Sequence, residues 1–498
     1  MRKTGLRQGH APVAEAMRAY AADGALAFHT PGHKQGRGAH HLLQELIAAE
    51  GLREEVSLME ELDDLHEPTG CIREAEQLAA ELYGAAEAHF CINGTTGAIQ
   101  GMLLAALAPG DKVLVPRNAH KSIVGALTLT GARQVWLQPE YDARLGTPLN
   151  IAPETVRQAV KAHPEAKALV LVYPTYYGVT TELAEIADFV HERGLVLLVD
   201  EAHGPHLPFS GELPREAIAA GADIAAVSTH KILGSLTQTS MLLVHRDCLV
   251  DRERIRESMS MLQSTSPNQL LLASLDIARL QMAEAGKELV GRAVRLAEEL
   301  RGAINALPGL WSPGRDYFRR PGASGLDATK ITVSVAGLGL SGPEAEHYLR
   351  HEQKIQCELS DARNLLFIIS YADTEQETSR LLAALQALAA SAAHSGAEAT
   401  VSTRGASGPI LCREPVLTPR EAFFADKERI AFDQAPGRIA AEQVMFYPPG
   451  IPLLVPGDLI DSEMLSYIRE QQALGLKVVG PSDCSLQTLK VVKSCRAN

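Results

Sequence analysis

A lysine and an aspartate stand where a covalent cofactor site needs them. Lys231 follows Ser-Thr-His at 228–230, with apolar or small residues on both sides, and Asp200 follows the apolar run 195–199. A lysine near a buried strand end either forms an ion pair or takes part in a reaction, because burial lowers the pKa of its amine and makes the neutral amine available as a nucleophile. Such a pair is typical of enzymes that bind pyridoxal phosphate (PLP), in which the lysine forms a Schiff base and the aspartate pairs with the pyridinium nitrogen.

A phosphate-binding loop is the second feature. Asn-Gly-Thr-Thr-Gly at 93–97 leads into a helical pattern rich in alanine and leucine. Backbone N–H groups and hydroxyls at a helix N-terminus bind phosphate well. An ordinary glycine-rich turn with a threonine cap explains these residues equally well. The loop is not a Walker motif, since no Gly-Lys-Ser/Thr follows it.

Histidines and hydroxyls add weaker candidates. His120 follows the apolar run 112–115, so we expect it at the C-terminal edge of a sheet, where its ring can stack on a planar cofactor. The cluster Gln-Ser-Thr-Ser-Pro at 263–267 is explained as well by a helix start. No metal site is expected, because four other histidines match no ligand spacing: His29, His33, His40 and His41.

An alternation of helix and strand must position these residues. The short apolar runs that predict strands are 112–115, 134–137, 168–172, 195–199, 224–227 and 241–244. Continuously apolar strands are covered on both faces, so we expect an α/β fold with a mainly parallel sheet. Thr69 is expected to cap a helix over 72–83. In a doubly wound sheet the loop, His120, Asp200 and Lys231 would share one crevice.

The chain is long enough for several parts, and we predict five of them. They are an N-terminal segment (1–68), a PLP-binding large domain (69–306), a smaller α+β domain (307–390), a linker (391–409) and a C-terminal α/β unit (410–498). The linker is small and polar and cannot build a core. Prolines in 447–457 predict a rigid, non-helical loop.

Composition restricts the partners. The 498 residues carry a net charge of −13, which disfavours nucleic acid and anionic membranes. The N-terminal residues have no apolar stretch after their positive charges, so we expect no signal peptide, and no apolar run is long enough to span a bilayer. Seven scattered cysteines without a CxxC pair fit reduced thiols, so we expect a cytoplasmic protein.

Together these motifs resemble the Orn/Lys/Arg decarboxylase family of fold-type I PLP enzymes, in the short bacterial form that resembles arginine decarboxylase. The segments that carry the resemblance are 93–97, 118–122, 200–204, 228–231, 263–267 and Pro-Pro-Gly-Ile-Pro at 448–452. The resemblance covers nearly the whole chain from residue 29. It is specific for the family and weak for the substrate.

The resemblance implies roles at the cofactor ring. Lys231 would form the Schiff base, Asp200 would keep the pyridine nitrogen protonated, and His120 would stack on the ring. His203 stands where longer relatives carry an aromatic residue, which leaves the packing beside Asp200 open.

The resemblance also implies how the phosphate is held. The residues that would hold it are Gly94, Thr95, Thr96, Ser228 and His230. Thr265 or Ser266 would reach the phosphate of a neighbouring subunit. A homodimer or higher homo-oligomer with shared sites is therefore implied.

The implied activity is decarboxylation of a basic L-amino acid for polyamine biosynthesis, with arginine favoured, giving agmatine and CO2. Carboxylates would bind the distal cation of the substrate. The candidates are Asp63, Asp64, Glu358, Asp361 and Glu442, each equally explained as a solvated acid or a helix cap. A site for arginine needs a planar bidentate partner, whereas a site for lysine needs a point charge. The sequence does not distinguish these two kinds of site, so lysine and ornithine remain alternative substrates.

Two other functions stay open. An aminotransferase or lyase on the same scaffold would clamp the substrate carboxylate with an arginine; Arg363 is a candidate, in an untypical setting. A non-catalytic PLP-binding regulator would lack the lysine or carry a DNA-binding unit. Lys231 is present and no basic helix-turn-helix segment is visible, which disfavours the regulator.

Overall fold

The computed structural model describes residues 8–394, 412–446 and 450–493. The chain divides into two compact units. The first holds Met1–Ala106, Leu198–Gly211 and Arg215–Leu289; the second holds Leu107–Leu197, Glu212–Pro214 and Val290–Asn498. Most of the predicted linker, and Pro448 and Pro449, lie outside the described residues. Within the described ranges, no helix is long and apolar enough to cross a membrane.

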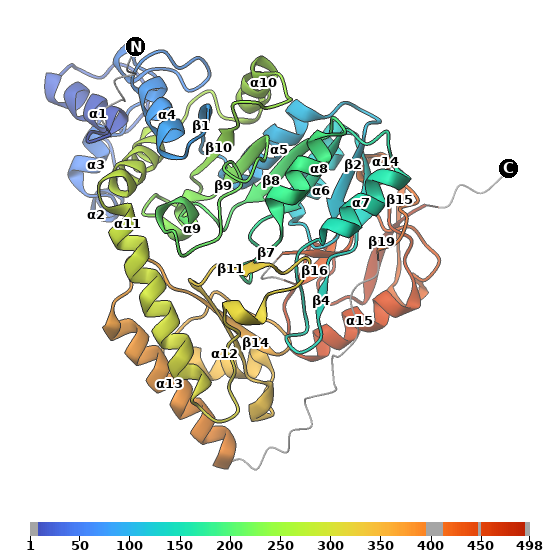
Figure 1. The fold of residues 1–498 in the computed structure, drawn as a ribbon. Helices are drawn as coiled ribbons and strands as arrows, with labels where there is room; N and C mark the ends of the chain where they lie inside the picture. Colours follow the sequence, from blue (N-terminus) through green and yellow to red (C-terminus); the bar gives the residue numbers. More distant parts are fainter. Residues whose placement is uncertain (1–7, 395–411, 447–449, 494–498) are drawn as a thin grey trace. The chain divides into compact units, whose positions relative to one another are not determined.

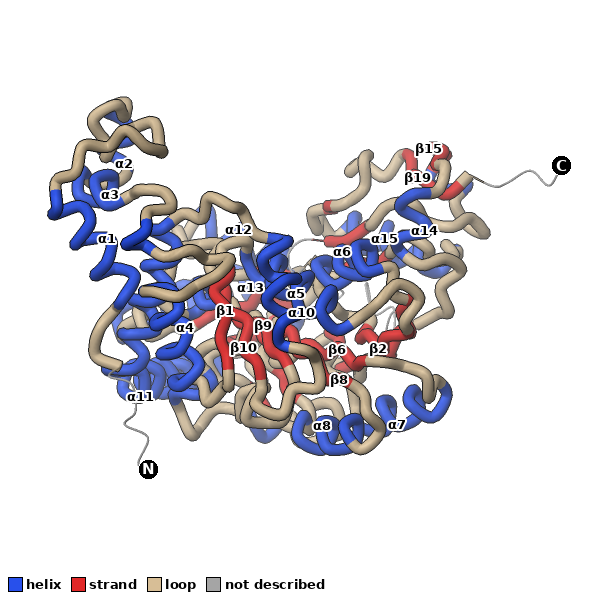
Figure 2. Tube along the Cα trace, turned by 90° about the horizontal axis from the view of Figure 1, so that it is seen from above, coloured by secondary structure: helices blue, strands red, loops and turns tan. Residues whose placement is uncertain are grey.

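The first unit is built on strands in the order β1 (Glu87–Cys91), β10 (Ser240–Val244), β9 (Ile224–Val227) and β8 (Val196–Glu201). Strands β8 and β9 are parallel, whereas β10 is antiparallel to both β9 and β1. The helices α5 (Gly94–Ala106) and α10 (Arg252–Leu262) pack together beside β1, β9 and β10 (Figure 2). The sequence did not predict strand β1, because Glu87 and His89 interrupt its apolar pattern.

An N-terminal group of helices belongs to the same unit. Its elements are α1 (Pro12–Asp23), α2 (His41–Leu46), α3 (Ala49–Glu54), η1 (Glu60–Leu62) and α4 (Cys71–Leu82). The short helix α9 (Thr229–Ile232), which follows β9, belongs to the same unit. The long helix α11 (Gln269–Asn305) begins in this unit. Its buried Asp276–Arg279 ion pair holds the N-terminal segment: Asp276 accepts the Val13 N–H (3.0 Å), and Arg279 donates to the Gln8 carbonyl (2.8 Å).

The second unit contains parallel strands in the order β6 (Ala168–Val172), β2 (Lys112–Pro116) and β3 (Arg133–Leu137), close to the predicted runs. The helices that follow strands here are α6 (Lys121–Thr130), α7 (Pro153–Ala162) and α8 (Leu183–His191). Helices α7 and α8 lie side by side (Figure 1). The parallel pairs in both units make the α/β part mainly parallel, as expected.

An α+β part of the second unit follows α11. Its antiparallel strands have the order β12 (Lys330–Ser334), β14 (Asn364–Ile368) and β13 (Leu359–Ser360). The end of α11 shares a core with these strands and with α12 (Gly342–His351) and α13 (Glu375–His394). Helix α13 runs into the segment predicted as a linker.

The C-terminal part of the second unit has its own core, centred on buried residues such as Phe432, Ile468 and Leu489. Its elements are α14 (Pro419–Phe424), β15 (Lys427–Ala431), β16 (Val444–Phe446), β17 (Pro452–Leu454), α15 (Ser462–Ala473), β18 (Val478–Val479) and β19 (Thr488–Val492). The prediction of a loop is wrong over Pro452–Leu454, which pairs with β16. Proline is tolerated there because β17 is an edge strand.

Candidate active site

Lys231 and Asp200 lie at the same edge of the first unit's sheet. Asp200 is near the end of β8, and Lys231 lies on α9, directly after β9, the parallel neighbour of β8. The carboxyl ends of parallel strands meet at one edge, where ligands bind in α/β folds. Nζ of Lys231 lies 2.8 Å from Nε2 of His203. Asp200 and His203 are each only 4% exposed, so the lysine stands beside two buried polar side chains.

Asp200 is a buried carboxylate that is short of positive charge. Burial raises its pKa, and neither the charge of Lys231 nor the Ala202 N–H, which donates to Oδ1 at 3.2 Å, fully reverses the effect. Burying a carboxylate is costly unless a cation or several donors compensate it. A protonated pyridine nitrogen is such a partner, so this environment fits PLP.

The predicted phosphate loop forms the start of α5. Gly94 has a φ of 66°, a conformation that favours glycine, and its N–H donates to the Gln238 carbonyl at 2.8 Å. Its N–H is therefore already used. Thr95 is buried, and its Oγ1 has no hydrogen-bond partner among the described residues. A buried hydroxyl at the first turn of a 13-residue helix fits a phosphate group. Thr96, next to it, is exposed.

Ser228 and His230 flank Lys231 with defined geometry. Nδ1 of His230 lies 2.8 Å from the Thr239 carbonyl, so the proton is on Nδ1 and is donated there. The Ser228 hydroxyl lies 3.3 Å from the same nitrogen. Burial and the Lys231 charge lower the pKa of His230, against the Thr239 carbonyl, which raises it. Its Nε2 is thus an acceptor in the neutral ring and donates to a phosphate only when the ring is charged.

His120 in the second unit is oriented by its own helix. It is the N-cap of α6, and its Nδ1 accepts the Ser122 N–H at 3.3 Å. The Ser122 hydroxyl lies 2.8 Å from the same atom. The ring orientation therefore follows from the local turn after β2.

Thr265 and Ser266 are exposed on the loop between α10 and α11. Gln263 anchors the base of this loop, because its Oε1 accepts the Ile92 N–H (3.0 Å) and its Nε2 donates to the Phe90 carbonyl (3.2 Å). The hydroxyls are thus presented on a fixed base, next to the segment that precedes Gly94.

Asp63 caps α4, and the prediction that Thr69 does so is wrong. The N-cap position is Gly70, which has no side chain. Asp63 Oδ1 accepts the Thr69 N–H (2.8 Å), while its Oδ2 accepts those of Gly70 (2.8 Å) and Ile72 (3.0 Å). Asp63 reaches these amides from outside the helix, with a φ of 64°. The carboxylate therefore stabilises a helix start.

The other acidic candidates differ in their surroundings. Asp64 accepts the His66 N–H at 2.9 Å. Asp361 accepts the Tyr177 hydroxyl at 2.7 Å and two backbone N–H groups, and burial raises its pKa. Glu442 bridges the Ser482 and Lys490 N–H groups at 2.8 and 2.7 Å. Three of these carboxylates thus hold backbone in place.

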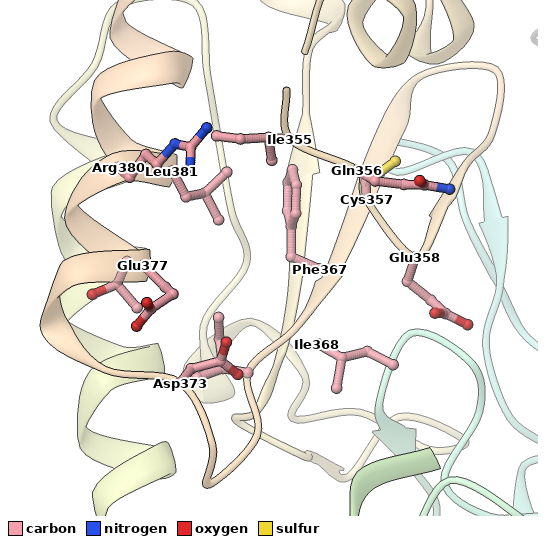
Figure 3. A pocket seen from close by; sticks show the side chains of 12 residues that line it. Ile355, Gln356, Cys357, Glu358, Phe367, Ile368, Asp373, Glu377, Arg380 and Leu381 are labelled. Carbon is pink, nitrogen blue, oxygen red and sulfur yellow. The ribbon is translucent and has the colours of Figure 1, made fainter. Parts of the chain in front are cut away.

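Glu358 is exposed, as Asp64 is, and lines a pocket of about 570 Å3 in the α+β part. The pocket also has an apolar side around Phe367 and the acidic residues Asp373 and Glu377 (Figure 3). The candidate acids are divided between the two units: Asp63 and Asp64 belong to the first unit, and Glu358, Asp361 and Glu442 to the second.

Two residues were missed by the sequence analysis. Gln238, at a φ of 87°, accepts the Gly94 N–H and donates from Nε2 to the Ile92 carbonyl at 2.7 Å. Thr239 fixes His230 through its carbonyl. Their signal in the sequence is the polar run at 237–240 between Lys231 and β10.

Comparison with known proteins gives the family. The major domain of the Orn/Lys/Arg decarboxylases matches residues 11–313, and their C-terminal domain matches residues 410–480. An arginine decarboxylase of Bacillus anthracis is 43% identical over 491 residues, with 98% of each chain covered. An arginine decarboxylase of Bacillus subtilis (strain 168) is 40% identical over 494 residues, which covers 99% of this chain and all of that one (100%).

A solved structure shows the same fold. The lysine decarboxylase LdcF of Francisella novicida superposes with a TM-score of 0.85 at 20% identity, covering 97% of this chain and 81% of that chain. The predicted fold-type I α/β class is confirmed. The family implies dependence on PLP. This chain is a decarboxylase and belongs to the Orn/Lys/Arg decarboxylase family.

Proposed function

We propose that the protein is a PLP-dependent arginine decarboxylase, which converts L-arginine and a proton to agmatine and CO2. The observation that carries the proposal is the full-length similarity to chains named arginine decarboxylase, at 40–43% identity. We extend it to a supply of agmatine for polyamine synthesis and to a cytoplasmic location, both expected from the sequence.

The first unit supplies the groups for the cofactor. Lys231 would hold PLP covalently through Nζ, and Asp200 would pair with its pyridine nitrogen. The buried Thr95 hydroxyl, Ser228 and a charged His230 would hold the phosphate. When bound, PLP would supply an electron sink for the electron pair left on the substrate's Cα as CO2 departs.

Protein groups would then place the substrate and move the proton. His120 would stack against the ring and restrict its orientation. Asp200 would stabilise positive charge on the ring nitrogen, and its carboxylate is already in place before substrate binds. The proton that replaces the carboxylate on Cα would come from Nζ of Lys231 or from Nε2 of His203, which lie 2.8 Å apart.

Thr265 and Ser266 support a proposed dimer with shared sites. Both are exposed on a loop whose base is fixed by Gln263. In this proposal their hydroxyls reach the phosphate of the neighbouring subunit, so each site would be completed by two chains.

The test is a decarboxylation assay with arginine, lysine and ornithine side by side, with CO2 and keto acid both measured. The proposal requires CO2 from arginine with kcat/KM at least about tenfold above the other two. A keto acid product would instead support an aminotransferase. Lys231→Ala should lose the visible absorbance of bound PLP; an unchanged spectrum would refute the site assignment.

A further inference from the structure

Arg117 joins the turn after β2 to the C-terminal part of the chain, within the second unit. Its buried guanidinium donates from Nη1 to the Pro452 carbonyl (2.6 Å) and from Nη2 to the Leu453 carbonyl (2.7 Å). Nη2 also donates to Oδ2 of Asp458 at 3.1 Å. The centre of the guanidinium lies 5.1 Å from the ring centroid of Trp136. One side chain thus binds two carbonyls, a carboxylate and an aromatic face.

The carboxylate of Asp458 also has several partners. Burial raises the pKa of Asp458, and the charge of Arg117 and the Val455 N–H (3.1 Å) lower it. Removing one member of a buried pair leaves an uncompensated charge, which is strongly destabilising. A lysine cannot replace the arginine, because an ammonium lacks the planar fork that reaches several acceptors.

A second bond joins the same two segments on the other side of His120. The Lys121 N–H donates to the Gly450 carbonyl at 3.3 Å. The turn 117–121 is therefore bonded at both ends to the segment 450–458, and His120 lies between the two attachments. The segments are far apart in the chain: Arg117 and Pro452 are separated by 335 positions.

Other contacts besides those of Arg117 attach the C-terminal part to the rest of the second unit. Arg420 on α14 donates to the Thr128 and Leu129 carbonyls near the end of α6, at 3.1 and 3.0 Å. The Cys412 N–H donates to the side chain of Gln138, at 2.8 Å. These contacts hold the part elsewhere, whereas Arg117 meets it next to the turn that carries His120.

We propose that Arg117 is a positioning residue of the decarboxylase: by clamping the segment Pro452–Asp458, it fixes the turn that aims the His120 ring. The inference rests on the proposed function, in which this ring meets the cofactor. Its consequence is that the C-terminal part acts on catalysis through the orientation of the His120 ring.

The test compares Arg117→Lys with a matched control, Arg301→Lys, in the full-length enzyme. Arg301 is also buried, and it also donates to two carbonyls and a carboxylate: those of Ala328 (2.9 Å), Lys330 (3.0 Å) and Glu298 (2.6 Å). Both substitutions should lower the melting temperature, because each removes charge-assisted hydrogen bonds. A general loss of stability is thus matched between the two variants.

Three measurements separate positioning from stability. Hydrogen exchange of peptides covering 117–123, in protein without PLP, should speed up about tenfold in R117K and not in R301K. The Kd for PLP should rise about tenfold, and the induced circular dichroism of bound PLP should change, in R117K alone. Asp458→Asn, which keeps the shape of the carboxylate but not its charge, should change all three in the same direction.

The inference is overturned if R117K and R301K show the same exchange at 117–123 and the same PLP affinity and dichroism. Failure of the proposed function looks different: the wild-type protein would then form no chromophore that depends on Lys231. In that case faster exchange in R117K would still establish the clamp on the turn, and unchanged exchange would refute it.

Discussion

Nζ of Lys231 lies 2.8 Å from Nε2 of His203, a residue that follows Asp200 by three positions. The chain reverses after β8, so the end of that strand supplies both the buried carboxylate and the imidazole next to the lysine. A phenylalanine at 203 would offer packing there but no acceptor for the amine. The lysine of this chain thus has a polar neighbour with its own capacity to exchange a proton.

Replacing His203 by phenylalanine should keep PLP bound and slow the reaction. The ring fills the buried space, but the atom that faces Nζ is lost, so kcat should fall about tenfold or more. The pH dependence of the visible absorbance should also shift. His203→Gln, which keeps a polar group, should lie between Phe and the wild type. Equal kcat in all three proteins would exclude a role of the imidazole in proton transfer.

Asp200→Asn should separate stability from catalysis. Asparagine replaces a buried carboxylate, and burial raises the pKa of that carboxyl group because the charged form is costly to bury. The variant without PLP should therefore be at least as stable to heat as the wild type. The amide cannot stabilise the protonated pyridine, and kcat should fall by about 10²–10⁴-fold. A large loss of thermal stability, or a kcat near that of the wild type, would contradict this account of Asp200.

The acidic candidates can be sorted by their contacts. Glu442→Gln should lower stability, since the carboxylate bridges two backbone N–H groups, and should leave the KM for arginine within about twofold of the wild-type value.

Glu358 is exposed and lines a pocket, so Glu358→Gln should leave the melting temperature unchanged. If Glu358 binds the distal cation, KM rises; an unchanged KM removes it from the substrate site.

Glu76 should make stability fall as pH rises. Its Oε1 accepts the Phe90 N–H at 2.9 Å, and burial raises its pKa from 4.5 to about 7. The folded state therefore holds a proton that the unfolded state has released between these two values, so the contribution of this group falls across that window and stays low above it.

Glu76→Gln should remove that loss. Urea unfolding at pH 8.5 should show the variant more stable than the wild type by about 1–3 kcal/mol, with the advantage gone near pH 5. Glu81→Gln, which changes an exposed acid on the same helix, is the control and should show no such trend. A constant difference at both pH values would mean that Glu76 is ionised in the folded protein.

Local sequence patterns predicted much of the fold and of the candidate site. Strands β2, β3, β6, β9 and β10 and the helix α4 lie close to the predicted ranges, because continuous apolar runs and helical periodicity report burial directly. The placement of Asp200 and Lys231 at one sheet edge followed from their positions after two strands. Strand β1 was missed because its alternating polar residues serve contacts on one face.

The tertiary structure decided which of several equivalent residues does what. The sequence alone determined that a lysine, an aspartate and a helix start lie at strand ends, since strand ends are local. It did not determine that Asp63 rather than Thr69 caps α4, that His203 meets Lys231, or that Arg117 binds Asp458 across 341 positions. Those pairings form only when the folded backbone brings distant polar groups within hydrogen-bonding distance and buries their charges. Local sequence periodicity carries no information about distances between segments that are far apart in the chain.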